Sequence, residues 1–142
     1  MRIFLYRAAF LIPLVWASCG GASGEGILVV ANGSVPARAV KSDEIREIFL
    51  GERRTLADGS KISPVLLKNG PSHQAFLNAY IGKSDGAFRA GWMRLVFTGK
   101  GSLPRTFDTE PGLLEYVAGT PGAIGYIHSS TPHPNVRVLT VK

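Results

Sequence analysis

Short apolar runs alternate with amphipathic segments along most of this chain. Buried strands are predicted over 27–31, 62–67 and 123–127, because each is a brief, mainly aliphatic run with Gly, Pro, Asn or Asp close by. A last strand with a weaker, alternating pattern is predicted over 136–141.

Four helices are predicted where apolar residues recur at spacings of three and four. Each has a capping residue or turn before it and a glycine after it. In chain order, the cap or turn and the terminating glycine of each helix are as follows: Ser42 with Gly51, the turn 69–72 with Gly82, Ser84 with Gly99, and Thr109 with Gly119. The resulting order, β-α-β-α-α-α-β-β, predicts an α/β fold with a mixed or parallel sheet and helices on both faces.

The helical spacing also predicts which side chains form the core. The inner face of the second helix is expected to consist of Phe76, Ala79 and Tyr80. In the third helix Phe88, Trp92 and Phe97 resemble a ligand cage, but their spacing predicts core packing instead.

Residues 1–24 have the three parts of an export signal. Arg2 and Arg7 supply a positive start, an apolar run covers 8–16, and small residues follow. The apolar run is about half of the ~20 residues that span a bilayer. Cys19 is the only cysteine, and it stands where a lipid-anchored cysteine would stand. We therefore expect an exported protein, cleaved or anchored near this segment, with one folded domain over 25–142.

The charge of the chain favours anionic ligands only weakly. The net charge is +6, and beyond residue 24 the chain has 14 basic and 10 acidic residues. The basic residues are scattered, with Arg53 and Arg54 the only adjacent pair, which argues against a nucleic-acid binder.

The sequence holds no pattern typical of an enzyme. No serine lies in a G-x-S-x-G motif, and the domain beyond Cys19 has no thiol nucleophile. His128 and His133 are close in sequence, but a Pro-rich loop predicts a solvated segment and not a metal site. Non-enzymatic binding without a metal or cofactor is the expectation.

The turn at 69–72 is the strongest candidate for a binding site. It lies between a predicted strand and the start of a helix, where free backbone N–H groups and the helix dipole favour an anion. Ser72 could add a hydroxyl donor. The alternative is that Ser72 only caps its own helix.

Three segments give a resemblance to a known family. They are 45–51 (IREIFLG), 92–101 (WMRLVFTGKG) and 121–126 (PGAIGY), and together they extend the likeness over nearly all of 26–128. They resemble the phosphate-type substrate-binding proteins of ABC importers. The resemblance implies a single lobe of a type 2 periplasmic-binding-protein fold, a periplasmic location and a part in phosphate uptake.

The same resemblance implies a set of ligand-binding residues. The family's phosphate turn, Arg-x-x-Gly-Ser-Gly-Thr, aligns its Thr with Ser72, but its Arg with Leu66 and one Gly with Pro71. The expected anion ligands are Lys68, Asn69, Gly70, Ser72 and His73 in and beside this turn. Arg105, a lone arginine after Leu103-Pro104, is added from the sequence itself and not from the resemblance. Two functions remain open. One is a phosphate-binding module, in which a homodimer would rebuild the cleft and for which an ABC permease is a candidate partner. The other is an adaptor without ligand that contacts an envelope protein.

Overall fold

The computed structural model describes residues 26–142. The predicted export segment 1–24, with Cys19, lies outside these residues. No helix within the described part is long and apolar enough to cross a membrane.

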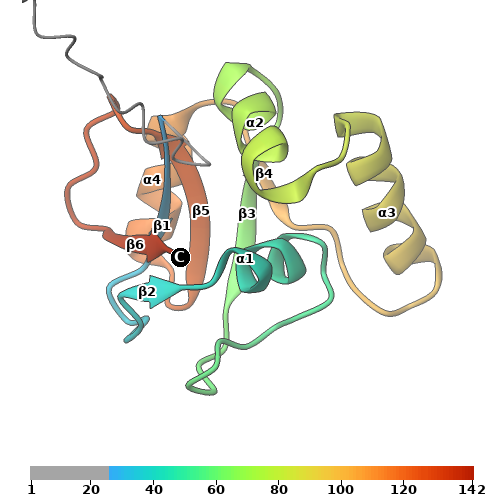
Figure 1. Ribbon diagram of the computed structural model, residues 1–142, viewed down its shortest axis with the longest axis horizontal. Coiled ribbons are helices and arrows are strands. Elements are labelled where there is room, and N and C mark those ends of the chain that lie inside the picture. The colour runs from blue at the N-terminus through green and yellow to red at the C-terminus, as the bar shows by residue number, and fades with distance from the viewer. Residues whose placement is uncertain (1–25) are drawn as a thin grey trace, which may run out of the picture.

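A six-stranded sheet forms the centre of the domain (Figure 1). Its strands are β1 (Ile27–Ala31), β2 (Ala39–Val40), β3 (Ser63–Leu67), β4 (Arg105–Phe107), β5 (Ala123–His128) and β6 (Arg137–Val141). Their order across the sheet is β2-β6-β1-β5-β3-β4. β1 is antiparallel to both of its neighbours, β5 and β6, whereas every other pair is parallel. Five strands therefore run in one direction, and the central β1 runs in the other.

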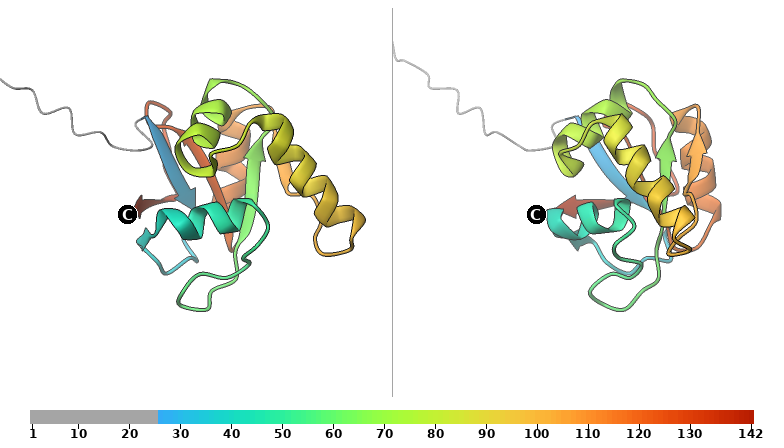
Figure 2. Two further views of the ribbon diagram at one scale, coloured as in Figure 1. Left: turned by 45° about the vertical axis from the view of Figure 1, so that its right-hand side comes forward. Right: turned by 90° about the vertical axis from the view of Figure 1, so that its right-hand side faces the viewer.

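Helices cover both faces of the sheet. They are α1 (Ser42–Phe49), α2 (Pro71–Phe76), the π-helical turn η1 (Leu77–Ile81), α3 (Asp85–Phe97) and α4 (Glu110–Gly119). Figure 2 shows α1 and α2 on one face and α4 on the other, with α3 standing out beside the β3–β4 edge. The predicted α/β class and the mostly parallel sheet are confirmed.

Aromatic packing joins the helices to the central strands. The ring of Tyr126 on β5 stacks on Phe76 with centroids 3.9 Å apart, and Phe49 meets Phe76 edge-on at 4.7 Å. All three side chains are fully buried. Offset and edge-to-face pairs of this kind add to the free energy of burial, so this cluster fixes α1 and α2 on the sheet.

Most predicted elements are confirmed, including two of the predicted caps. Ser84 accepts a hydrogen bond from Ala87 N, and Thr109 accepts one from Gly112 N. The prediction that Ser42 caps α1 is wrong. Lys41 occupies the cap position, and its backbone N–H reaches the Glu44 carboxylate instead.

Three details differ from the predictions. Phe97 is 82% exposed, because it is the last residue of α3, beyond the turns that carry the buried Phe88 and Trp92. The second helix widens into a π-helical turn, which turns Leu77 and Ile81 inward, while Ala79 and Tyr80 are only half-buried. The short strands β2 and β4 were not predicted, because two or three residues are too few to show an alternation of apolar and polar positions.

α3 is attached through a small contact area. Of its side chains only Phe88 and Trp92 are buried, and the Trp92 indole donates a hydrogen bond to the Phe49 carbonyl at 2.9 Å. Gly51, in the left-handed conformation with φ +78°, lies so close that a Cβ there would come 2.9 Å from the Trp92 ring. Gly82 and Gly99 adopt the same conformation on either side of α3.

Candidate functional site

The predicted anion turn lies at the carboxyl edge of the parallel strands. β3 ends at Leu67 and α2 begins at Pro71, so residues 68–70 form the connection. The neighbouring β4 ends at Phe107, and the Lys68 backbone N–H donates to its carbonyl at 2.9 Å. Ligands in open α/β sheets bind outside this edge of the strands. The turn therefore lies at the edge of the sheet where ligands bind in other open α/β folds.

Gly70 sets the shape of this turn. Its φ of 103° and ψ of 175° are accessible to glycine and strained for other residues. Gly70 is the N-cap of α2 and Pro71 is the first helical residue, so the alternative in which Ser72 caps the helix is wrong. Ser72 instead lies in the first turn, half-buried. The N–H groups of a first helical turn have no partner within the helix.

The remaining predicted turn residues are exposed. The Lys68 ammonium lies 3.9 Å from the Asp108 carboxylate, and their side chains are 62% and 83% exposed. A pair this long and this exposed contributes little binding energy, so solvent and anions compete for Lys68. The side chain of Asn69 is exposed as well.

His73 differs from the other predicted residues because it is buried and both of its ring nitrogens have hydrogen-bond partners. Its Nδ1 lies 2.5 Å from the Tyr126 hydroxyl, and its Nε2 lies 2.8 Å from the Asp85 carboxylate. The Tyr126 hydroxyl also accepts the Leu67 N–H at 3.0 Å. Asp85 in turn accepts a hydrogen bond from Arg89 Nε at 2.9 Å, and Arg89 reaches the Lys68 carbonyl.

These hydrogen bonds determine where the protons lie in the hydrogen-bonded series Tyr126–His73–Asp85–Arg89. A carboxylate only accepts, so Nε2 of His73 carries the proton that bonds Asp85. Nδ1 then accepts from the Tyr126 O–H, whose oxygen remains free to accept from Leu67. Every group has a partner when His73 is the neutral Nε2–H tautomer. The chain Tyr126–His73–Asp85–Arg89 thus connects both ends of the turn to β5 and to α3.

Two members of the chain have shifted pKa values. Burial raises the pKa of Tyr126 well above its usual value, so the phenol stays protonated. Burial also acts to raise the pKa of Asp85, but the hydrogen bonds from His73 and Arg89 outweigh it and hold this pKa below its usual value. Asp85 therefore remains a carboxylate near neutral pH.

A hollow of about 350 Å³ lies beside this chain, between α3 and the β3–β4 edge. His73, Asp85 and Arg89 form its polar part, and the rest of its wall is mainly apolar. Among residues 26–142, no group of three or more His, Cys, Asp and Glu side chains is placed to hold a metal ion.

The structure places Arg105 apart from the turn. Arg105 begins β4 and pairs with Val65, while the turn follows the far end of β3. Its guanidinium carbon lies 5.3 Å from the centre of the Tyr116 ring. Arg105 lines a different hollow, together with Arg53 and Arg54. Five of the six predicted ligand residues thus lie within 68–73, and the sixth, Arg105, lies elsewhere.

Sequence analysis missed Tyr126, Asp85 and Arg89. A tyrosine inside the apolar run 123–127 could have been noticed, because a buried phenol needs a hydrogen-bond partner. Asp85 and Arg89 are four residues apart just after the predicted cap Ser84, a spacing that places both on one helix face. Nothing in the sequence indicates that His73 is their partner.

Comparison with solved structures identifies the fold. A structure from Clostridium perfringens, described as a phosphate ABC transporter substrate-binding protein with bound phosphate, aligns with a TM-score of 0.63 and 19% identity. It covers 82% of this chain and 44% of that one. An ABC-type phosphate transport receptor from Vibrio cholerae aligns at 0.53 with 13% identity, covering 82% and 46%. PstS from Borrelia burgdorferi aligns at 0.54 with 13% identity, covering 82% and 47%.

Comparison of the sequence with protein families and with curated proteins finds no match. The chain spans less than half the length of the solved structures named above. These structures are transport substrate-binding proteins, and their names denote no enzyme. The described domain therefore has the fold of the phosphate-type substrate-binding proteins of ABC transporters, over a part of their length.

Proposed function

We propose that this protein is an exported, non-enzymatic binding module that takes phosphate or a similar oxyanion at the turn formed by residues 68–73. The observation that carries the proposal is the position of this turn. It stands at the carboxyl edge of the sheet, in a fold whose solved neighbours include one with bound phosphate.

Each turn residue has a part in the proposed site. The backbone N–H groups of Ser72 and His73, together with the Ser72 hydroxyl, would donate hydrogen bonds to the oxyanion, since Pro71 has no N–H. Lys68 and Asn69, both exposed, would supply charge and a further donor. His73 has both ring nitrogens occupied, so it would hold the turn in place and leave contact with the anion to its neighbours.

A single turn supplies about half of the donors that a bound phosphate needs. In this proposal the other side of the anion is covered by a second protein surface, the simplest being a second copy of this chain. The ABC permease of a phosphate uptake system would receive the ligand, and the site of action would be the periplasm.

The test is thermal unfolding of the protein with ~10 mM phosphate, against sulfate and chloride at matched ionic strength. A dissociation constant near 100 μM would stabilise the domain by about 2.7 kcal/mol at that concentration. For a domain of this size the melting temperature would rise by roughly 10 °C. The shift should be specific to phosphate and be lost in Ser72→Ala. It should persist in Ser42→Ala, an exposed serine at the start of α1.

The adaptor function has one observation in its favour. Leu66, where the family's turn has Arg, is a buried core residue of β3 and cannot contact an anion. If phosphate, sulfate and chloride shift the melting temperature equally, the turn has lost its ligand. The fold would then serve contact with an envelope protein, which cross-linking in intact cells would capture.

A further inference from the structure

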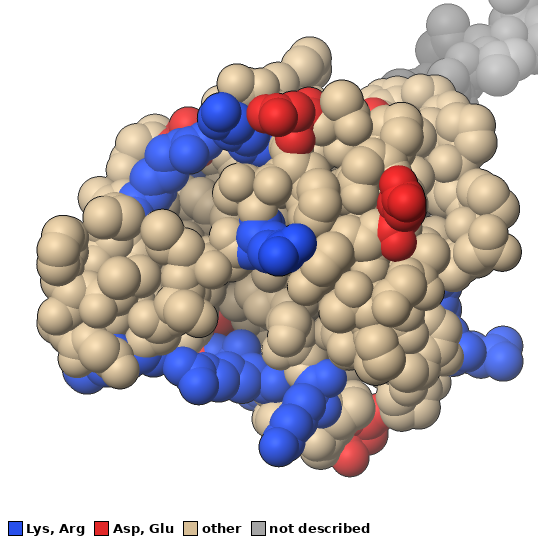
Figure 3. All heavy atoms as spheres, turned by 180° about the vertical axis from the view of Figure 1, so that it is seen from behind, with Lys and Arg blue, Asp and Glu red and all other residues tan. Residues whose placement is uncertain are grey.

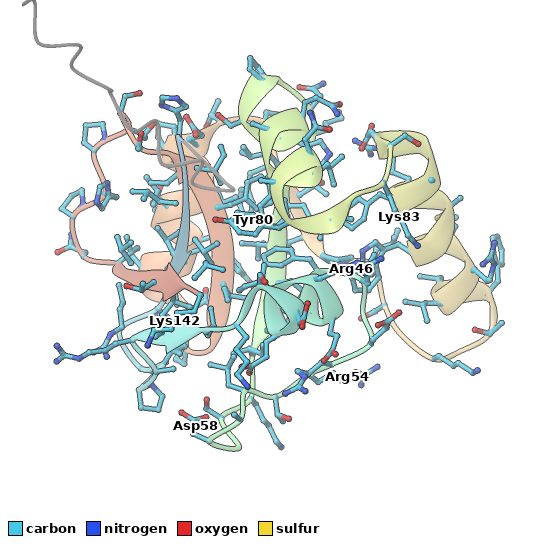
Figure 4. All side chains as sticks on the ribbon, in the orientation of Figure 1. Arg46, Arg54, Asp58, Tyr80, Lys83 and Lys142 are labelled. Carbon is cyan, nitrogen blue, oxygen red and sulfur yellow. The ribbon has the colours of Figure 1, made fainter. Side chains whose placement is uncertain are left out.

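A second hollow, the arginine pocket, lies near the start of β3, at the opposite end of that strand from the turn. Its volume is about 320 Å³, and Arg53, Arg54 and Arg105 line it from two different segments. Figure 3 shows Lys and Arg side chains around the hollowed face between α3 and the rest of the domain. Figure 4 shows Arg54 on the loop that follows α1, on the side toward α3.

Two of the three guanidinium groups have no carboxylate partner in the described structure. Arg53 is neutralised by Glu47 at 2.7 Å and Glu44 at 3.6 Å. Arg54, in contrast, donates to the Lys100 carbonyl at 2.7 Å, and Arg105 stacks over the Tyr116 ring. A carbonyl and an aromatic ring orient these cations without cancelling their charge. Most of their N–H donors remain available.

Polar and apolar side chains share the walls of the pocket, and no Asp or Glu is among the described residues that line it. Among the apolar lining residues, Ile48, Ile62, Val65 and Trp92 are almost fully buried, whereas Leu103 is exposed and Pro64 and Pro104 are half-buried. Ser63 and Ser102 add hydroxyl groups. A volume of this size and a mixed lining are typical of small-molecule sites.

We propose that the arginine pocket binds a small organic anion whose carboxylate is held by Arg54 and Arg105. A planar carboxylate matches the fork of N–H donors on a guanidinium, and such hydrogen bonds are among the strongest in proteins. The body of the ligand packs against Leu103, Pro104 and the accessible edge of Trp92. Inorganic phosphate lacks such a body, so it leaves Leu103 exposed to water.

This site is separate from the turn of the proposed function. None of the residues 68–73 lines the arginine pocket. The two proposals can therefore be tested independently, because a failure to bind at one site does not imply a failure to bind at the other.

The probe is benzoate, with benzamide as its uncharged analogue and inorganic phosphate as an anion without an apolar body. Each is titrated into the ¹⁵N-labelled full chain. The backbone amides of Ser63, Ser102 and Arg105 and the Trp92 indole are followed by NMR. Benzoate is expected to shift these signals in a saturable way, whereas benzamide and phosphate shift them little. Arg54→Gln and Arg105→Gln should each weaken benzoate binding about tenfold or more, since each removes charge-assisted hydrogen bonds.

Arg94→Gln is the matched control. Arg94 is an exposed arginine of α3 that does not line the pocket, so its loss removes the same charge without touching the site. Ser72→Ala should leave benzoate binding unchanged, which separates this result from the phosphate test. The proposal is overturned if benzoate shifts none of these signals or if benzamide binds equally well. It is also overturned if phosphate shifts them as strongly, or if both pocket variants bind benzoate like Arg94→Gln.

Discussion

Asp85 is the residue on which most of the turn's geometry converges. It accepts hydrogen bonds from His73 on α2 and from Arg89 one helical turn away, and Arg89 reaches back to the Lys68 carbonyl. One carboxylate therefore links the start of α3 to the segment that carries the proposed anion site.

Replacement of Asp85 by Asn should lower the free energy of unfolding by about 1 kcal/mol at pH 7, a modest figure because the side chain is partly exposed. The pKa of Asp85 is lowered in the folded state, so the unfolded state binds the proton first as the pH falls. Its contribution is complete above the unfolded-state pKa of about 3.9 and is lost as the pH falls through the folded-state pKa.

Urea unfolding at pH 7, 5 and 3 measures this effect. The difference between the wild-type protein and Asp85→Asn should be present at pH 7 and 5 and shrink at pH 3. Asp108→Asn removes an exposed carboxylate with a long ion pair and should change little at any pH. A difference that stays constant with pH would show that the charge of Asp85 plays no part.

At the scale of elements, the sequence predicts what depends on long periodic patterns. The four helices and four main strands follow from apolar spacing, and Ser84 and Thr109 act as caps because their side chains meet local backbone groups. Phe97 is exposed although its spacing resembles that of Trp92. The spacing of apolar residues predicts which face of the helix is apolar, but it does not predict which part of that face another element covers.

The candidate site follows the same rule. The turn itself is local and could be predicted, whereas its support could not. Tyr126 and His73 are 53 residues apart, and only the register of the folded sheet brings them together. Arg54, on the loop after α1, and Arg105, at the start of β4, are distant in the sequence and line one pocket for the same reason.

The end of α1 offers a test of how tightly α1 and α3 pack. Gly51 and Gly59 both adopt the left-handed conformation, but a Cβ at Gly51 would lie 2.6 Å from Leu95 and 2.9 Å from Trp92, whereas Gly59 faces open space. Gly59→Ala should cost only the backbone strain, about 1 kcal/mol. Gly51→Ala should cost about 3 kcal/mol, because overpacking adds to the same strain. Urea unfolding of both variants gives the comparison, and equal costs would mean that α3 moves aside freely.

The whole molecule consists of a tightly joined sheet and one loosely attached helix. β1 and β5 lie in the buried centre of the sheet, while α3 has hollows on two sides and buries only Phe88 and Trp92. Local stability in proteins follows burial of this kind, since elements with few apolar contacts open more easily.

Amide hydrogen exchange should reveal this difference. The amides of α3 are expected to exchange at least tenfold faster than those of β1 and β5, through openings that leave the sheet intact. Benzoate, if it occupies the arginine pocket, should slow exchange in α3 by holding Trp92 in place. Equal protection of α3 and β5 would contradict a separately opening helix.

The reversed central strand has a consequence for how the chain acquires its structure. β1 is the first described strand, yet both of its neighbours, β5 and β6, come from the last part of the chain, and Ile27 pairs with His128. Contacts between residues about 100 positions apart close late and slowly during folding. The centre of the sheet therefore cannot assemble on the ribosome until β5 and β6 have been synthesised. Until then the nascent chain holds β1 without either of the strands that flank it in the sheet.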